Sequence, residues 1–189
     1  LSKMEELGYT NSFEVLNSMD FGIPQSRNRV YTVSILGTKK FNFDKLIRVK
    51  TKHINEFLED TKEEKYIVSQ PSMLKKIPCS DKFIKNNYGS LKVIEDSCLT
   101  ITTKQMRCPN AGIVKVANDK YRYLTEKECW RLMGFEDSDF ENALKTHKGT
   151  QGKLNGTLYK QAGNSIVVQV LEAIFRELLG VKGGINGRE

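Results

Sequence analysis

Two arginines at the start of a predicted strand are the residues of this sequence best suited to chemistry. From Arg27 to Leu36 the residues follow the pattern of a β-strand. Arg27 and Arg29 therefore share a face with the apolar residues that follow, because side chains two residues apart point to the same side. A guanidinium placed there must meet a buried carboxylate, a phosphate or the edge of a base. An internal salt bridge is the competing interpretation.

A second segment, residues 124–135, predicts a short helix whose two ends are both encoded in the sequence. Thr125 is a suitable N-cap, and Glu128 three residues later completes a capping box. Gly134 supplies the left-handed residue that ends a helix. Arg131 lies among apolar neighbours, so we expect it to have a carboxylate or carbonyl partner. Taken alone, the segment indicates no more than a well-capped core helix.

A third segment, near the C-terminal end, predicts a helix with an unusually wide apolar side. Residues 161–165 read Gln-Ala-Gly-Asn-Ser and are expected to open this helix. From Ile166 to Leu178, apolar residues recur at helical spacing. The sheet expected from residues 1–36 is too small to cover them. We therefore expect exposed apolar surface between Ile166 and Leu178.

Nearly all of the excess of Lys and Arg over Asp and Glu lies in the middle of the sequence. The net charge is +7, and residues 37–107 contain 15 Lys and Arg against 9 Asp and Glu. Such an excess is typical of proteins that bind a polyanion, although many lysine-rich domains bind none. Without a signal sequence or an apolar run of membrane length, we expect a soluble, cytoplasmic protein with no membrane partner. Four cysteines without a C-x-x-C pair favour reduced thiols and no metal site.

The elements that must position these residues change in character along the chain. Residues 1–36 carry one helix signal and two strand signals, and the last helix signal lies within residues 158–179. Residues 37–157 show short apolar clusters between lysines, which predict a small, irregular, mostly β domain with a supporting helix and a return linker. Residues 180–189 are expected to be a tail.

Inside the middle unit, two segments predict strands. Residues 98–103 read as one strand, and residues 113–123 read as a hairpin that turns at Asn118 and Asp119. After the helix of residues 124–135, residues 147–156 are rich in glycine, so we expect a flexible linker.

Three separated segments resemble motifs of the DNA cytosine-C5 methyltransferases of bacterial restriction–modification systems. Residues 21–31 contain that family's Gln-x-Arg-x-Arg pattern, and residues 123–135 are similar to the motif that supports its target-recognition domain. Residues 159–168 resemble the last motif, of the Gly-Asn-Ser-Val type. Their order and spacing also fit. The resemblance implies an α/β fold: the C-terminal part of a Rossmann-like methyltransferase domain with an inserted, mostly β target-recognition domain.

The resemblance also implies a reaction, the transfer of a methyl group from S-adenosylmethionine to C5 of cytosine in double-stranded DNA. The target base is flipped out of the duplex in this family. Arg29 matches the arginine that hydrogen-bonds O2 of that base, where a cation stabilises charge developing on the ring. Gln25 and Arg27 match residues that brace this site and its phosphate.

Further site residues follow from the same comparison. Thr100 and Ile101 resemble a Thr-Leu dipeptide whose threonine contacts a DNA phosphate. Asn164 and Ser165 match positions beside the methyl donor, and simple helix capping is the competing interpretation. We expect the lysines of residues 39–92 to contact phosphates. Base contacts are expected from loops of the recognition domain, with residues 85–90 and Lys104, Gln105 and Arg107 as candidates.

Several parts of the family pattern do not occur in this sequence. The Pro-Cys-Gln nucleophile loop, the Phe-x-Gly-x-Gly cofactor loop and the Glu-Asn-Val carboxylate are missing. Cys79 follows a proline but lacks the glutamine and comes after the arginine strand, so we do not expect it to be catalytic. The chain also starts at Leu1 rather than Met. We therefore expect a C-terminal portion, inactive alone, that partners a missing N-terminal half in the same parent chain or in a separate subunit.

Two alternatives remain open from the sequence. The chain could be a non-catalytic DNA-binding specificity subunit or a remnant of a split methyltransferase. It could also be a relative that methylates cytosine in tRNA.

Overall fold

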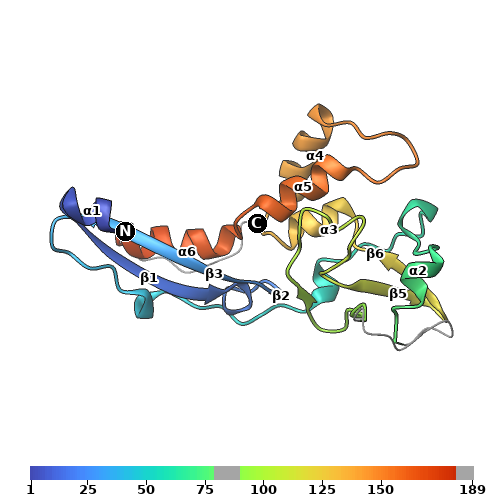
Figure 1. Ribbon diagram of the computed structural model, residues 1–189, viewed down its shortest axis with the longest axis horizontal. Helices are drawn as coiled ribbons and strands as arrows, with labels where there is room; N and C mark the ends of the chain where they lie inside the picture. The colour runs from blue at the N-terminus through green and yellow to red at the C-terminus, as the bar shows by residue number, and fades with distance from the viewer. Residues whose placement is uncertain (79–89, 182–189) are drawn as a thin grey trace.

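A long antiparallel hairpin forms one arm of the molecule (Figure 1). The computed structural model describes residues 1–78 and 90–181. Strand β1 (Tyr9–Asn17) pairs with β3 (Asn28–Leu36) along its whole length. Helix α1 (Ser2–Glu6) precedes the hairpin. The strand expected from residue 27 to residue 36 is confirmed to within one residue.

The two faces of this hairpin differ in burial, as the alternation of side chains along a strand requires. Leu16 is buried on one face, where the partly buried side chains Tyr31, Val33 and Ile35 pack against the main core. On the other face, Phe13 is 62% exposed and Val15 57%. Val30 and Leu36 belong to that open face as well. The hairpin thus presents an apolar surface to solvent.

Helix α6 (Val168–Leu179) runs along the same arm (Figure 1). Val170, Ala173 and Ile174 are buried in the main core, whereas Phe175 is 53% exposed. Ile166, just before the helix, is 51% exposed. The expected exposure between Ile166 and Leu178 is therefore confirmed for one side of the helix and wrong for the other.

The other arm is built from short strands and turns. Strand β2 (Gln25–Ser26) pairs in parallel with β4 (Cys98–Leu99), and β5 (Ile113–Ala117) pairs antiparallel with β6 (Lys120–Tyr123). The turn at Asp119, whose φ is +50°, confirms the expected hairpin. Elsewhere in residues 1–78, the short elements are α2 (Pro71–Leu74) and the 3-10 turns Ser18–Asp20, Phe43–Lys45, Ile54–Glu56 and Glu64–Tyr66.

The strand expected over residues 98–103 was too long, because β4 ends at Leu99. The reason lies at Ile101, whose backbone groups are taken by side chains. Its N–H donates to Gln25 and its carbonyl accepts from Arg27, so neither is available to continue the ladder with β2.

Helix α3 (Glu126–Arg131) begins as the sequence predicts. The Thr125 hydroxyl accepts the N–H of Glu128 at 3.0 Å, and the Glu128 carboxylate accepts the N–H of Thr125 at 2.7 Å. Arg131 makes two hydrogen bonds of 2.6 Å to Asp137, which is the expected carboxylate partner. The Arg131 guanidinium holds the pKa of Asp137 well below its usual range. Both expectations are confirmed.

The end of α3 is shaped by a contact with the last helix. Gly134 has φ of +87°, the left-handed conformation expected of it. A Cβ at this position would collide with the side chain of Gln169. The carbonyl of Met133 accepts the N–H of Val168 at 3.1 Å. The glycine is thus required by its left-handed backbone conformation, and the flexible end of Gln169 packs against it.

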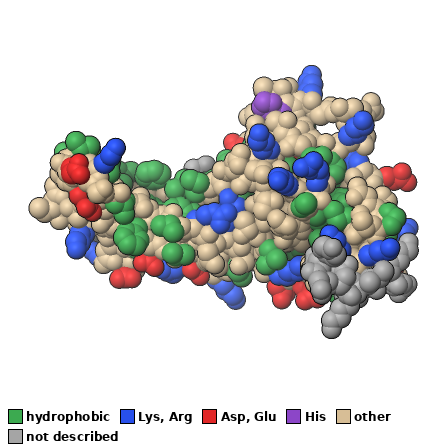
Figure 2. Space-filling model, in the orientation of Figure 1, with side chains coloured by type: hydrophobic (Ala, Val, Ile, Leu, Met, Phe, Trp, Pro, Cys, Tyr) green, Lys and Arg blue, Asp and Glu red, His purple; other side chains and the backbone are tan. Residues whose placement is uncertain are grey.

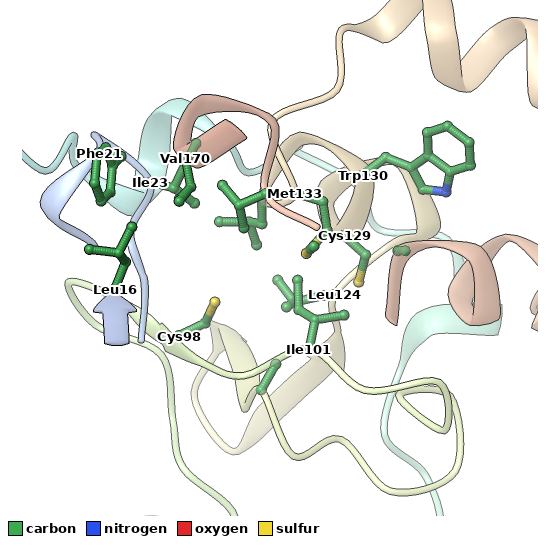
Figure 3. Packing of buried hydrophobic residues seen from close by; sticks show 14 of the residues in the cluster. Leu16, Phe21, Ile23, Cys98, Ile101, Leu124, Cys129, Trp130, Met133 and Val170 are labelled. Carbon is green, nitrogen blue, oxygen red and sulfur yellow. The ribbon is translucent and has the colours of Figure 1, made fainter. Parts of the chain in front are cut away.

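Helices α4 (Asp137–Thr146) and α5 (Gly156–Asn164) follow, and α5 docks on α3 through two hydrogen bonds. The Trp130 indole donates to the carbonyl of Leu158 at 3.1 Å, and the Tyr159 hydroxyl donates to that of Leu124 at 2.6 Å. Figure 3 shows that residues from both arms meet around α3 in one apolar cluster. Its labelled members are Leu16, Phe21, Ile23, Cys98, Ile101, Leu124, Cys129, Trp130, Met133 and Val170.

A buried ion pair ties α3 to β6. The guanidinium of Arg122 makes hydrogen bonds of 2.7 and 2.8 Å to the carboxylate of Glu128, and both side chains are almost fully buried. Glu128 also accepts the N–H of Glu59 at 2.7 Å, and Arg122 donates to the carbonyl of Glu59 at 2.9 Å. The sequence predicted Glu128 only as a capping residue. In the fold it joins the helix to two segments of the β-rich arm.

We predict that Glu128→Gln lowers the free energy of unfolding by about 3–5 kcal/mol, because the buried Arg122 loses its counter-ion. Urea titration followed by circular dichroism measures this quantity. As a control, Glu63→Gln removes the partly exposed pair with Lys65 and should cost no more than about 1 kcal/mol. A loss for Glu128→Gln as small as that of the control would contradict the role of the pair.

Candidate active site

The residues of the first motif lie where three segments of the chain meet. Gln25 is fully buried in β2. Its Nε2 donates to the carbonyl of Leu132 at 2.8 Å, and its Oε1 accepts the N–H of Ile101 at 2.9 Å. A single side-chain amide therefore joins the end of α3 to the segment that follows β4.

Arg27 makes a similar connection with a charged group. Its Nη1 donates to the carbonyl of Ile101 at 2.9 Å, and its Nη2 donates to those of Ser165 at 3.0 Å and Gly163 at 3.2 Å. The side chain is only 6% exposed. Burial, followed by the positive charge of Arg29, lowers the pKa of Arg27.

The sequence predicted a carboxylate, phosphate or base edge as the partner of Arg27, and this prediction was wrong. Backbone carbonyls take that place. They are free because α5 ends at Asn164 and α6 begins only at Val168. In a continuous helix, the carbonyls of Gly163 and Ser165 would accept N–H groups four residues later. Here they bind the guanidinium of Arg27, so the break in the helix and the buried cation satisfy each other.

This break also corrects the interpretation of residues 161–165, which were expected to open the last helix. They form the end of α5, and the hydroxyl of Ser165 donates back to the carbonyl of Gln161 at 2.7 Å. Asn164 and Ser165 are therefore not N-caps. Gly163 lies against the loop after β4, because a Cβ there would collide with the backbone of Thr102 and Thr103. The only signal of this contact in the sequence is a glycine within a helix.

Asn164 is exposed at the edge of a surface recess of about 420 Å³. The recess also contains an unsatisfied group, since Oε1 of Gln161 is buried without a hydrogen-bond partner in the described part of the chain. The other lining residues are Trp130, Thr157, Lys160 and Ser165. An exposed amide and an unpaired acceptor can bind a polar ligand. Gln161 was not among the residues that the sequence suggested.

The Thr-Ile dipeptide lies beside the first motif. The hydroxyl of Thr100 donates to the carbonyl of Ser26 at 2.9 Å. Ile101 was expected to bind DNA together with Thr100. Its side chain is fully buried, however, and is not accessible to DNA. Its backbone is instead the common partner of Gln25 and Arg27.

Arg29 differs from Arg27 in being exposed. It stands at the start of β3 opposite Leu16, on the hairpin face that contributes to the core. Its Nη1 donates to the carbonyl of Asn28 at 2.7 Å. It is close enough to lower the pKa of Arg27. The structure therefore presents a solvent-accessible guanidinium next to the buried one.

The three candidates for base contacts in the β-rich arm differ in accessibility. Lys104 and Arg107 are exposed. Gln105 is fully buried, and its amide binds the N–H of Ala111 at 3.2 Å and the carbonyl of Gly112 at 3.4 Å. It closes its own loop and is not available to a base, which corrects that expectation.

Two of the described cysteines are unsuited to be a nucleophile. Cys98 and Cys129 are fully buried, and burial raises the pKa of Cys98 to about 12 and that of Cys129 well above its ordinary value. Cys108 is exposed. Cys79 and residues 85–89 of the other candidate loop lie outside the described residues.

Two searches gave no candidate in residues 1–78 and 90–181. No three His, Cys, Asp or Glu side chains come together in a way that could hold a metal ion. No helix there is long and apolar enough to cross a membrane.

Comparisons with known proteins give matches over most of this chain. A family model described as C-5 cytosine-specific DNA methylase matches residues 1–180. The type II methyltransferase M2.ScrFI of Lactococcus lactis subsp. cremoris is 38% identical, over 93% of this chain and 47% of that protein. The type II methyltransferase M.NgoBI of Neisseria gonorrhoeae is 32% identical, over 92% and 52%. The chain thus spans about half the length of these curated relatives.

Solved structures share the fold. The crystal structure of the S. pombe Dnmt2 methyltransferase superposes with a TM-score of 0.73 at 23% identity and covers 95% of this chain and 60% of that one. The Entamoeba histolytica methyltransferase EhMeth gives a TM-score of 0.71 at 18% identity, with 96% and 57% covered. These neighbours support an α/β methyltransferase fold.

We predict that iodoacetamide modifies Cys108 quickly in the native protein, whereas Cys98 and Cys129 remain protected. Thiolate is the reactive form, and a pKa of about 12 keeps Cys98 protonated. Raising the pH from about 7 to about 9 should therefore speed labelling of Cys98 in urea but not in the native state. Peptide mass spectrometry measures each site. Rapid native labelling of Cys98 or Cys129 would contradict their assignment as inert core residues.

Proposed function

The chain belongs to the family of C-5 cytosine-specific DNA methylases, and from this premise we propose that it supplies the target-recognition and C-terminal portion of an enzyme that methylates C5 of cytosine in duplex DNA. In this proposal residues 1–36 and 158–179 belong to the catalytic domain, and residues 37–157 form the recognition domain. The observation that carries the proposal is the junction at Gln25 and Arg27, where the three motif-bearing segments meet.

Arg29 is the residue of this chain that we propose to act on the substrate. Attack of a thiolate on C6 forms a carbon–sulfur bond and places negative charge on the ring, including O2. A fixed cation at O2 stabilises that charge. Arg29 is exposed and lies beside Arg27, whereas Arg27 is fully engaged by carbonyls. The exposed arginine is therefore free to bind the base, and the buried one positions the segments around it.

The residues present fit one wall of a methyl-donor site. The amide of Asn164 is exposed in the recess, and the unpaired Oε1 of Gln161 can accept a hydrogen bond from an ammonium group. Ser165 is held beside them by its bond to Gln161. S-adenosylmethionine, when bound, supplies an electrophilic methyl group. The proposed role of these side chains is to orient its polar end, and no metal enters the proposal.

The nucleophilic thiolate is proposed to lie elsewhere, because Cys98 and Cys129 are buried and protonated, and neither Cys79 nor Cys108 lies in a Pro-Cys-Gln segment. We propose that it is carried by an N-terminal portion, in the same parent chain or in a separate subunit. The open hairpin face around Phe13 and Val15 and the exposed side of α6 at Phe175 support this proposal. Contiguous exposed apolar surfaces of this kind are typical of interfaces.

The DNA-facing residues are proposed in the same way. The hydroxyl of Thr100 donates to the carbonyl of Ser26, the residue before Arg27, and we propose that Thr100 contacts the phosphate beside the flipped base. Lys104 and Arg107 are exposed on the same arm and remain candidates for contacts with DNA. The lysines of residues 39–92 would add phosphate contacts that carry no sequence information.

We predict that Arg29→Ala reduces methyl transfer by about 10²–10³-fold, because the developing charge on the base loses its cation. The chain is combined with the N-terminal half of M2.ScrFI, and transfer of tritiated methyl groups to genomic DNA is measured. Binding of this complex to duplex DNA should be nearly unchanged. The control, Arg48→Ala, removes an exposed arginine paired with Asp20.

The same assay separates the alternatives. Normal transfer by Arg29→Ala would contradict its role. Duplex binding without transfer by the wild-type complex would identify a non-catalytic specificity subunit. Transfer to tRNA rather than DNA would identify an RNA-modifying relative.

A further inference from the structure

The segment that joins α4 to α5 is positively charged and lacks acidic residues. Residues 142–171 contain no Asp or Glu. They contain His147 and four lysines, all of them exposed: Lys145, Lys148, Lys153 and Lys160. The sequence predicted only a flexible, glycine-rich linker here. We call residues 145–160 the basic lobe.

Two acidic residues of α4 that precede the basic lobe are paired with basic side chains of α3. Asp137 binds Arg131 at 2.6 Å and Lys127 at 2.9 Å. Glu141 lies 3.6 Å from the same lysine. By contrast, no ion pair within the described ranges involves a lysine of the basic lobe. The positive charge of the lobe is therefore not neutralised by the fold.

The loop is held in a defined shape by Asn155. Its backbone N–H donates to the carboxylate of Glu126 at 2.5 Å, and its Nδ2 donates to the carbonyl of His147 at 2.7 Å. Its Oδ1 caps α5 by accepting the N–H of Thr157 at 3.2 Å. Gly149 packs against it, since a Cβ there would lie 3.1 Å from Nδ2. The lysines are thus presented on a closed loop and not on a free linker.

The basic lobe stands next to the candidate active site. In Figure 1, α4 and α5 project from the centre of the molecule, away from the hairpin arm. Figure 2 shows Lys and Arg side chains gathered on this projection. Lys160 lies one helical turn before Asn164, and both residues line the recess. Positive charge therefore runs from the edge of the site outward along the lobe.

We propose that the basic lobe is a second DNA-binding surface, which contacts phosphates of the duplex outside the segment read by the recognition domain. This inference rests on the proposed function, because it takes the substrate to be duplex DNA. Flexible lysines without acidic partners suit phosphates, whose binding releases counter-ions and needs no base sequence. The lobe adds affinity for flanking DNA and leaves sequence readout to the β-rich arm.

The test compares Lys148→Ala/Lys153→Ala with a control of equal charge change, Lys3→Glu, at the far end of the hairpin arm. Binding of the full chain to a mixed-sequence duplex of about 30 base pairs is followed by fluorescence anisotropy between about 50 and 200 mM salt. Each lost phosphate contact lowers the slope of log K against log salt by about 0.9, so the lobe variant should lose about 2. The control should keep the wild-type slope.

Each outcome bears on a separate claim. A wild-type slope for the lobe variant would overturn the lobe proposal and leave the proposed function intact. An equal loss in the control would overturn it as well, because the effect would then reflect net charge alone. Failure of the wild-type chain to bind duplex DNA, or a preference for tRNA, would overturn both proposals. All three lysines are exposed, and unchanged thermal melting verifies that both variants are folded.

Discussion

The arrangement of this chain depends on a buried cation that has backbone carbonyls for partners. Arg27 leaves water without a carboxylate to balance it, which is costly unless its donors are satisfied. The carbonyls of Ile101, Gly163 and Ser165 satisfy them, and they come from segments far apart in the sequence. A lysine could not span these acceptors, because an ammonium lacks the planar fork of a guanidinium. The same side chain therefore sets the end of α5 and the path of the chain after β4.

Around this junction the molecule has two arms of different completeness. The β-rich arm is closed by the buried network of Arg122, Glu128 and Glu59, which joins its strands to α3. The hairpin arm buries one face only, and Phe13 and Phe175 remain open to solvent. The domain division that we propose assigns the β-rich arm to target recognition and the hairpin arm to the catalytic domain. The residues proposed to touch the base lie at the boundary of the two.

Local features of the fold could be read from the sequence, and long-range ones could not. The capping box of Thr125 and Glu128 follows from residue types three positions apart, and the structure confirms it. The end of α5 was missed, because residues 161–178 read as one continuous helix until Arg27 takes two of its carbonyls. Gln105 was misjudged for a similar reason: its residue type suits base recognition, but its loop uses the amide. The candidate site residues were thus suggested by motif, while their division into buried and exposed side chains required the fold.

The central claim is that the guanidinium of Arg27 holds the loop after β4 and the α5–α6 break together, and hydrogen exchange of Arg27→Lys tests it most directly. The claim predicts at least about tenfold faster amide exchange in residues 99–103 and 162–168, since a lysine leaves carbonyls there without donors. Exchange in the β5–β6 hairpin should change far less. Wild-type protection of both segments in the variant would contradict the claim.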